Sequence, residues 1–387
     1  MLFRKSVAVQ SDQESLWLAT LTDAERRNVR EISSSPLMPT PDLLVLGGGI
    51  VGLATAYFAA TQGLKVQVLT DSDAFGSDAE YSLGCIVPNV CRWQFAPITQ
   101  QMAQSSRDWW AKLAVRPEFQ IDWRVCGALM VDAQRLAPSP RLHMLAALDE
   151  GYSVHDIDAE QVALLEPALS PLALGGLHYP SEAHLHPLKA ASGFITGLTR
   201  RGAHITKVDV ISSAHVEAQR VMEVQTSSGT ARPKAIFCDD HNLLAELLGD
   251  QARFSGLILT RQQFLATEPT SPLLKRPLLD AHWIVQLKSG EVLMAIPIND
   301  PADGRVESAV ERARQLIPAL RDVPFTRSWT GSSQRSPEAT PVVENISNFE
   351  NVWSSGGLDF AEVLFAPMIG KAVTEWIQIK DVMPGNR

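Results

Sequence analysis

The segment LLVLGGGIVGLATA, residues 43–56, decides the fold. An apolar run typical of a short strand leads into three glycines, and apolar residues at helical spacing follow them. Gly47, Gly49 and Gly52 form the pattern G-x-G-x-x-G between the predicted strand and the predicted helix. A second strand is predicted over residues 65–70, so the segment has the length of one βαβ unit. This context predicts a dinucleotide-binding loop, although a glycine-rich turn in an empty α/β fold is the alternative.

Each glycine of the predicted loop has a physical task. Gly47 permits the tight turn, Gly49 lets a pyrophosphate approach the backbone, and Gly52 lets the helix pack closely on the strand. The first amides of the helix, at Ile50 and Val51, then face the phosphates together with the positive end of the helix dipole. We therefore expect these five residues to bind the pyrophosphate.

The acidic residue expected to bind the ribose is displaced. Such a residue normally stands at the end of the second strand and accepts hydrogen bonds from the ribose hydroxyls. Thr70 stands at that place here, and the carboxylate follows one residue later, at Asp71. One lost charge-assisted hydrogen bond costs roughly 1.5–3 kcal/mol, so weakened rather than abolished binding is expected.

The composition is that of a globular protein, with 387 residues, 45% hydrophobic and 20% charged residues. A net charge of −9 argues against a nucleic-acid or anionic-membrane surface. The sequence contains no apolar stretch long enough for a membrane span, and its N-terminus turns polar before a signal-peptide core could form. Four scattered cysteines without a CxxC pair indicate reduced thiols in a cytoplasmic protein.

Strand and helix patterns alternate along the rest of the chain. Residues 1–41 are interpreted as an N-terminal appendage, with a short helix and a Pro/Ser linker. The remainder predicts an α/β protein, in which a Rossmann-like domain carries an inserted antiparallel-sheet (α+β) domain. The Rossmann-like domain is expected to comprise residues 42–92, 183–250 and 326–387. The inserted substrate domain is expected to comprise residues 93–182 and 251–325.

The order of segments resembles the D-amino-acid oxidase, glycine oxidase and D-amino-acid dehydrogenase family of flavoproteins, from about Asp42 to Ile379. The glycine loop is the one specific motif, and the shared order of weaker segments carries the rest of the resemblance. These segments are Ser82-Leu83-Gly84-Cys85-Ile86, Gly127-Ala128-Leu129, Leu165-Glu166-Pro167, His184-Leu185-His186-Pro187, Trp329-Thr330-Gly331 and Phe365-Ala366-Pro367.

The resemblance implies FAD as the cofactor and flavin-mediated hydride removal from a carbon next to an amine, usually without a side-chain base. Ser82 and Gly84 would run past the flavin, and Gly357 would lie in the turn before the last helix. The backbone near Val208 or Val210 would contact adenine. Arg335 and His186 are the candidates for substrate contact.

Three further positions depart from the family pattern. Asp239 and Asp240 stand in a turn where members carry small residues and glycine, and a carboxylate repels a diphosphate by about 1 kcal/mol at 4 Å in water-like surroundings. Ser333 stands where an arginine binds the substrate carboxylate, so Arg335, on the same face of the strand, is the candidate substitute. Glu362 stands where a small residue lets the backbone approach the flavin ring.

The leading hypothesis is an FAD-dependent oxidoreductase that acts on the CH–NH group of a small amine or amino acid, as a homo- or hetero-oligomer. The alternative is a catalytically silent flavoprotein-fold subunit that acts as a scaffold in a complex. A nicotinamide-dependent dehydrogenase shares the glycine loop but is disfavoured by the order of the other segments. His184 and His186 would face one side of a strand, yet polar packing is favoured over a metal pair, and no metal is expected.

Overall fold

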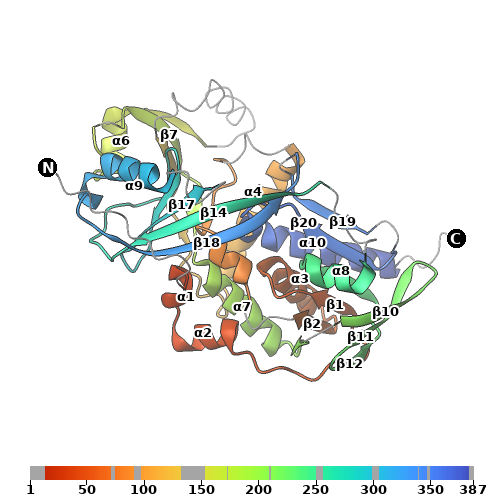
Figure 1. Cartoon of the computed structure of the whole chain (residues 1–387). Helices are drawn as coiled ribbons and strands as arrows, with labels where there is room; N and C mark the ends of the chain where they lie inside the picture. The colour runs from red at the N-terminus through yellow and green to blue at the C-terminus, as the bar shows by residue number, and fades with distance from the viewer. Residues whose placement is uncertain are drawn as a thin grey trace.

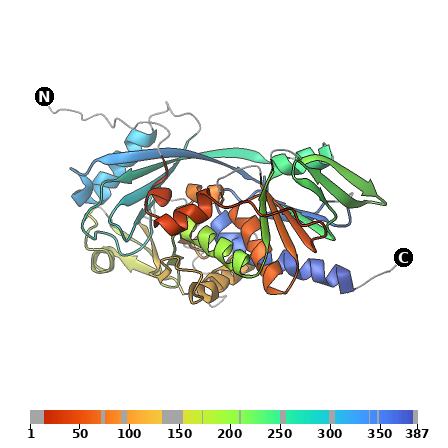
Figure 2. The ribbon, with the colours of Figure 1, turned by 90° about the horizontal axis from the view of Figure 1, so that it is seen from below.

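The computed structural model describes ten stretches of the chain: 14–70, 75–90, 97–131, 153–171, 173–208, 211–249, 256–298, 305–338, 340–346 and 349–382. Two sheets organise them, one toward each end of the molecule, with helices packed around both (Figure 1). Strands β14 (Ile258–Thr267) and β18 (Phe325–Arg335) run as a long pair along one side of the molecule (Figure 2). The predicted fold class, a mixed α/β protein, is confirmed.

The first sheet carries the predicted glycine loop. Its order is β19-β20-β13-β1-β2-β9, and all neighbours are parallel except β19 and β20. The strands are β1 (Leu43–Leu46), β2 (Val66–Thr70), β9 (His204–Lys207), β13 (Ala235–Cys238), β19 (Val342–Asn345) and β20 (Val352–Gly356).

Strand β1 is apolar throughout because helices and loops cover both faces of its sheet. Leu43 and Val45 pack into the main core, whereas Leu44 and Leu46 pack into a second cluster on the other face. The main-core side is formed by the helices α3 (Ile50–Thr61), α4 (Pro97–Ala114), α7 (Pro187–Arg200) and α10 (Glu362–Val382), and the other side by α8 (His241–Leu248).

The second sheet has eight strands and is almost entirely antiparallel. Its order is β18-β14-β17-β16-β15-β5-β7-β6, with one parallel pair, β15 and β5. Helices α6 (Ala159–Leu165) and α9 (Arg305–Leu316) share a core with it. The remaining strands are β5 (Ala128–Val131), β6 (His155–Asp158), β7 (Gly175–Tyr179), β15 (Leu278–Leu279), β16 (Trp283–Gln286) and β17 (Val292–Pro297).

Short elements complete the described part. One three-stranded sheet joins β10 (Ile211–Glu217), β11 (Arg220–Thr226) and β12 (Gly229–Ala231), and another joins β3 (Cys85–Ile86), β8 (Ala183–His184) and β4 (Arg124–Val125). Two short 3-10 helices are η1 (Ser77–Tyr81) and η4 (Pro318–Leu320). No helix in the described stretches is both long and apolar enough to cross a membrane.

The described part of the N-terminal segment packs into the main core instead of extending from it. Its helices α1 (Leu16–Ala19) and α2 (Asp23–Arg30) bury Leu16, Trp17 and Val29 there. The following stretch lies along the edge strand β9, where the amide of Ser35 donates to the Ile205 carbonyl at 2.8 Å. The proposed domain boundaries stay a prediction. The third Rossmann-like segment was predicted to begin at residue 326, but β18, which spans that position, belongs to the eight-stranded sheet.

Candidate dinucleotide site

The glycine loop forms the predicted strand, turn and helix. Strand β1 ends at Leu46, Gly47 makes the turn with φ +115°, and Gly49 is the N-cap of α3. The positive φ of Gly47 is a conformation that side chains with a Cβ rarely adopt. The amide of Gly47 donates to the Leu69 carbonyl at 2.8 Å, which ties the loop to the end of β2. The loop therefore has the backbone shape that a diphosphate site needs.

A carboxylate of the chain itself fills the space that the glycines leave open. Asp239 follows β13 directly, and its Oδ2 accepts a hydrogen bond from the amide of Gly52 at 2.6 Å. A Cβ built on Gly47 would lie 1.9 Å from Asp239 Oδ1, and one on Gly52 would lie 2.6 Å from Asp239 Oδ2. Gly52 therefore makes room for this carboxylate, where close helix–strand packing was predicted as its task.

A second carboxylate engages the first amide of the helix. Asp78 lies in η1, and both of its oxygens are 3.0 Å from the amide nitrogen of Ile50, which donates to them. A Cβ on Gly49 would lie 3.0 Å from Asp78 Oδ2 and 2.6 Å from Asp239 Oδ2. Anions bind helix N-termini because the free amides and the helix dipole stabilise negative charge. Asp78 and Asp239 occupy the anion-binding position of α3.

A third acidic side chain, Glu362 at the start of α10, belongs to the same region. Its Oε1 accepts a hydrogen bond from the hydroxyl of Ser333 at 2.8 Å. Ser333, which was predicted to stand at the family's arginine position, binds a carboxylate of the chain. We call Asp78, Asp239 and Glu362 the acidic cluster.

Burial raises the pKa of all three members of the acidic cluster, because the charged form loses hydration. The pKa of Asp78 rises to about 6 and that of Glu362 to about 7, and the pKa of Asp239 lies well above its usual range. Negative charge on Asp78 adds to the rise at Asp239 and Glu362. No ion pair to any of the three is found among the described residues, and Asp239 Oδ1 is inaccessible and unpaired there.

The other predicted cofactor contacts that the structure describes lie against residues of the chain itself, and their role toward FAD stays a prediction. Thr70 is buried at the end of β2, with its hydroxyl beside Gly48. Ser82 accepts a hydrogen bond from the Gly84 amide at 3.1 Å, and its carbonyl accepts one from the indole of Trp17 at 2.7 Å. Gly357 has φ +70°, and a Cβ there would lie 3.0 Å from the amide nitrogen of Ser336. The predicted contacts Asp71 and Val210 lie outside the described residues.

The two candidate substrate contacts, His186 and Arg335, lie in different surroundings. His186 caps α7: its Nδ1 accepts from the Lys189 amide at 3.3 Å, and its Nε2 lies 3.1 Å from the Thr20 hydroxyl. The ring also packs edge-on against Trp17, at 4.8 Å between centroids, so both of its nitrogens are used within the chain. Arg335 is half-buried at the end of β18, on the strand face of Ser333. Its role as a substrate contact stays a prediction.

A cluster of aromatic rings packs between η1 and the strands β14 and β18. Phe264 and Trp329 stack at 5.4 Å between ring centroids, and Tyr81 and Phe360 pack against Phe264. A Cβ on Gly331 would lie 2.5 Å from the Tyr81 ring, so this glycine makes room for an internal side chain. The sequence did not indicate this cluster. Within the described ranges, no three His, Cys, Asp or Glu side chains are arranged so that they could hold a metal ion together.

Comparison with known proteins identifies the family. The family described as "FAD dependent oxidoreductase" matches residues 42–376, so the chain belongs to this family. Glycine oxidase of Bacillus licheniformis is 23% identical over 363 residues, which cover 87% of this chain and 95% of that protein. The predicted family is thereby confirmed, together with the class of reaction that its named relatives catalyse, flavin-dependent oxidation of amines and amino acids.

Solved structures show the same fold. Glycine oxidase from Bacillus cereus superimposes with a TM-score of 0.76 at 22% identity, covering 88% of this chain and 95% of that chain. L-proline dehydrogenase from P. horikoshii has a TM-score of 0.78 at 18% identity, covering 89% and 95%. At these identities the likeness establishes the fold alone.

FAD is the cofactor of this family, as the sequence predicted. The residues of this chain do not fit the diphosphate of FAD, however, because the Ile50 and Gly52 amides and the space beside the three glycines are taken by Asp78 and Asp239. The repulsion expected from Asp239 is therefore joined by direct occupation of the site. Asp240 has another role, since its side chain caps α8.

Proposed function

We propose that this chain is a flavin-free member of the FAD-dependent oxidoreductase family that serves as a scaffold subunit. The hydrogen bond from the Gly52 amide to Asp239 Oδ2, at 2.6 Å, is the observation that carries the proposal. It places an internal carboxylate at the point where the family fold presents its amides to a diphosphate.

Electrostatics and sterics both support the proposal. Like charges 4 Å apart repel by about 1 kcal/mol in water and by about 4 kcal/mol at the effective dielectric typical of a protein surface. Protonation would remove the charge of Asp78 and Asp239 but would leave their side chains in the space beside the glycines. FAD can therefore bind only if both side chains leave the amides that they now satisfy.

A second candidate function is the reaction of the family, flavin-dependent oxidation of a small amine or amino acid. One observation favours it: the match to glycine oxidase of Bacillus licheniformis covers 95% of that enzyme, so the chain contains a counterpart of almost its whole length. This function requires the carboxylates to move aside on binding FAD.

The two candidates are separated by the flavin content of the purified protein. The full chain is purified without added flavin, its absorbance near 450 nm is recorded, and it is then titrated with FAD. The scaffold proposal expects a colourless protein with no saturable FAD binding. A yellow protein whose flavin is bleached by glycine, sarcosine, proline or a D-amino acid would overturn it and establish the second candidate.

Location and assembly are part of the same proposal. The thiols of Cys126 and Cys238 are free, which agrees with a reducing compartment such as the cytoplasm. A scaffold subunit acts within a homo- or hetero-oligomer. Light scattering after size-exclusion chromatography measures the mass of the purified chain, and a mass of about 42 kDa would exclude the homo-oligomer.

A further inference from the structure

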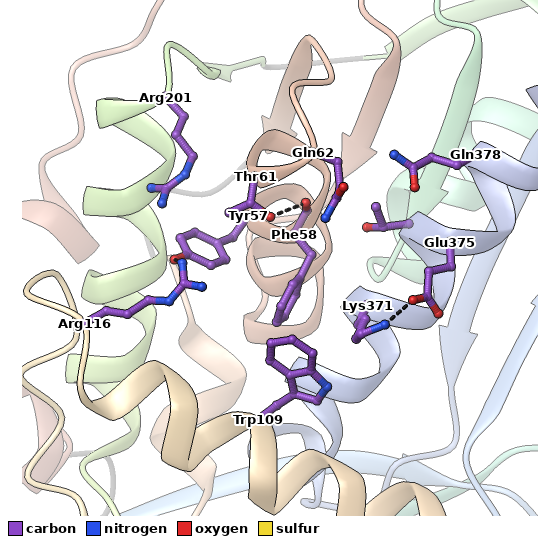
Figure 3. Close-up of a pocket in the computed structure, with 11 residues that line it drawn as sticks. Tyr57, Phe58, Thr61, Gln62, Trp109, Arg116, Arg201, Lys371, Glu375 and Gln378 are labelled. Carbon is purple, nitrogen blue, oxygen red and sulfur yellow. Dashed lines mark hydrogen bonds and ion pairs between the residues drawn. The ribbon is translucent and has the colours of Figure 1, made fainter.

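A pocket of about 440 Å³ lies beside the carboxyl-terminal half of α3, away from the glycine loop (Figure 3). Residues of α3, α4 and α10 line it, together with residues that follow the ends of α3, α4 and α7. Tyr57 is seven residues beyond Ile50, about 10 Å further along the helix axis. The pocket is therefore separate from the acidic cluster, and its volume is within the range of small-molecule sites.

Aromatic rings form the apolar part of the pocket. Phe58 and Trp109 meet edge to face, with 5.3 Å between ring centroids, and Tyr57 lies beside Phe58 on α3. Trp109 is half-buried, so part of its indole remains accessible to a ligand. Tyr57 is fully buried and Phe58 is 7% exposed, so Trp109 supplies most of the accessible ring surface for a planar ligand.

Positive charge dominates the polar part. The charged residues that line the pocket are three cations, Arg116, Arg201 and Lys371, and one anion, Glu375. Lys371 is paired with Glu375. Arg201 lies over the Tyr57 ring, 4.8 Å from its centroid, and is 3.4 Å from Glu118.

The third cation, Arg116, binds a hydroxyl group instead of a carboxylate. Its Nη1 donates to the Tyr57 hydroxyl at 2.8 Å, and no ion pair to it occurs among the described residues. A guanidinium binds a carboxylate through two parallel hydrogen bonds, a geometry that an ammonium group cannot provide. Arg116 therefore has donors left for a planar anion beside the aromatic rings.

We propose that this pocket binds a small aromatic carboxylate, with its carboxylate on Arg116 and its ring system against Phe58 and Trp109. The proposal rests on the charges and rings of the pocket and is independent of whether the glycine loop holds FAD. Lys371 and Glu375 neutralise each other, and Arg201 is paired with Glu118, so Arg116 supplies the positive charge that is left for the ligand.

The test uses the full chain and 2-naphthoate as the probe, with binding measured by isothermal titration calorimetry. We expect saturable binding of one equivalent and at least about tenfold weaker binding of 2-naphthamide, which has the same shape without the charge. Arg116→Gln should weaken 2-naphthoate about tenfold or more and leave 2-naphthamide unchanged. Trp109→Leu should weaken both ligands, because it removes ring contact without removing charge.

The control variant is Arg232→Gln, which removes an exposed arginine on the β10–β12 sheet side of the molecule and should leave the affinity unchanged. Melting temperatures of all variants establish that they fold, and Arg116→Lys, which keeps the charge, should bind with an affinity between those of the native chain and Arg116→Gln. The proposal is overturned if 2-naphthoate shows no saturable binding, if the amide binds as tightly as the acid, or if Arg116→Gln and Arg232→Gln behave alike. Added FAD should not displace 2-naphthoate, so the proposed function can fail without this proposal failing.

Discussion

The carboxylate of Asp239 and the amide of Gly52, 187 positions apart in the sequence, are joined by a 2.6 Å hydrogen bond. The amide belongs to the first turn of α3, whose free donors make it an anion site. Asp239, which directly follows the adjacent parallel strand β13, supplies the acceptor. An intramolecular carboxylate thus satisfies the backbone group that a dinucleotide-binding fold normally keeps for its ligand.

Removal of the two carboxylates should create affinity for FAD. The double variant Asp78→Ser, Asp239→Ala removes both acidic side chains and reopens the space beside the glycines. The native chain should show no saturable binding of FAD, whereas the variant, with the space open and the source of repulsion removed, should bind FAD saturably. Quenching of FAD fluorescence during titration measures the change.

The matched control for this prediction is Asp108→Ala, Glu217→Ala, which changes the net charge equally at exposed positions. It should bind FAD no better than the native chain. Equal affinities of the two double variants would show that the acidic side chains are not what keeps FAD out.

The sequence predicted one half of this arrangement. The strand, turn and helix around the glycines followed from local periodicity, and Asp239 stood out because family members carry small residues and glycine in that turn. Asp78 gave no signal, because its contact with Ile50 depends on how η1 folds back over the loop. Tertiary contacts of this kind leave no pattern in a single sequence.

The N-terminal segment shows a second limit of sequence reasoning. Its polar composition suggested an appendage, yet Leu16, Trp17 and Val29 are buried in the main core. The composition is an average over the segment, so it does not reveal a few apolar residues that all pack against the main core. The same averaging explains why Trp17 was not foreseen as the partner of His186.

Glu182 should make the protein less stable as the pH rises. This side chain is fully buried, its Oε2 has no partner among the described residues, and burial raises its pKa to about 8. The folded state therefore holds a proton that the unfolded state releases near its ordinary pKa of 4.5. The contribution to stability is complete below pH 4.5 and is lost as the pH rises to 8, by a few kcal/mol in all.

Urea unfolding of the native chain and of Glu182→Gln, at several values between pH 5 and 9, measures this dependence. The amide imitates the protonated acid, so the variant should lose less stability than the native chain as the pH rises. The exposed substitution Glu217→Gln serves as the control and should follow the native curve. If the free energy of unfolding of Glu182→Gln and of the native chain falls equally with pH, Glu182 is not protonated in the folded state and the prediction is wrong.

His184 and His186 should act in the opposite direction. Burial lowers the pKa of each ring to about 3, so both are neutral in the folded protein. The unfolded state binds protons near pH 6.5, and stability is therefore lost as the pH falls from 6.5 toward 3, by about 2 kcal/mol for each ring at pH 5. Nitrogen chemical shifts of the two rings should stay constant between pH 5 and 8. A titration of either ring in that window would contradict its neutral, buried state.

Trp17 should be essential for stability although it lies in the segment that composition marks as an appendage. Its side chain is 1% exposed, its indole donates to the Ser82 carbonyl at 2.7 Å, and it packs on His186. Trp17→Ala should cost about 3–5 kcal/mol, because it leaves a large cavity and an unpaired carbonyl. Trp17→Phe, which fills most of the cavity, should cost less. The matched control is Trp376→Ala, since Trp376 is 40% exposed on α10 and its loss should cost well under half as much. Urea unfolding measures the free energy of unfolding of the three variants. Equal losses of stability in Trp17→Ala and Trp376→Ala would contradict the packing of Trp17 in the main core.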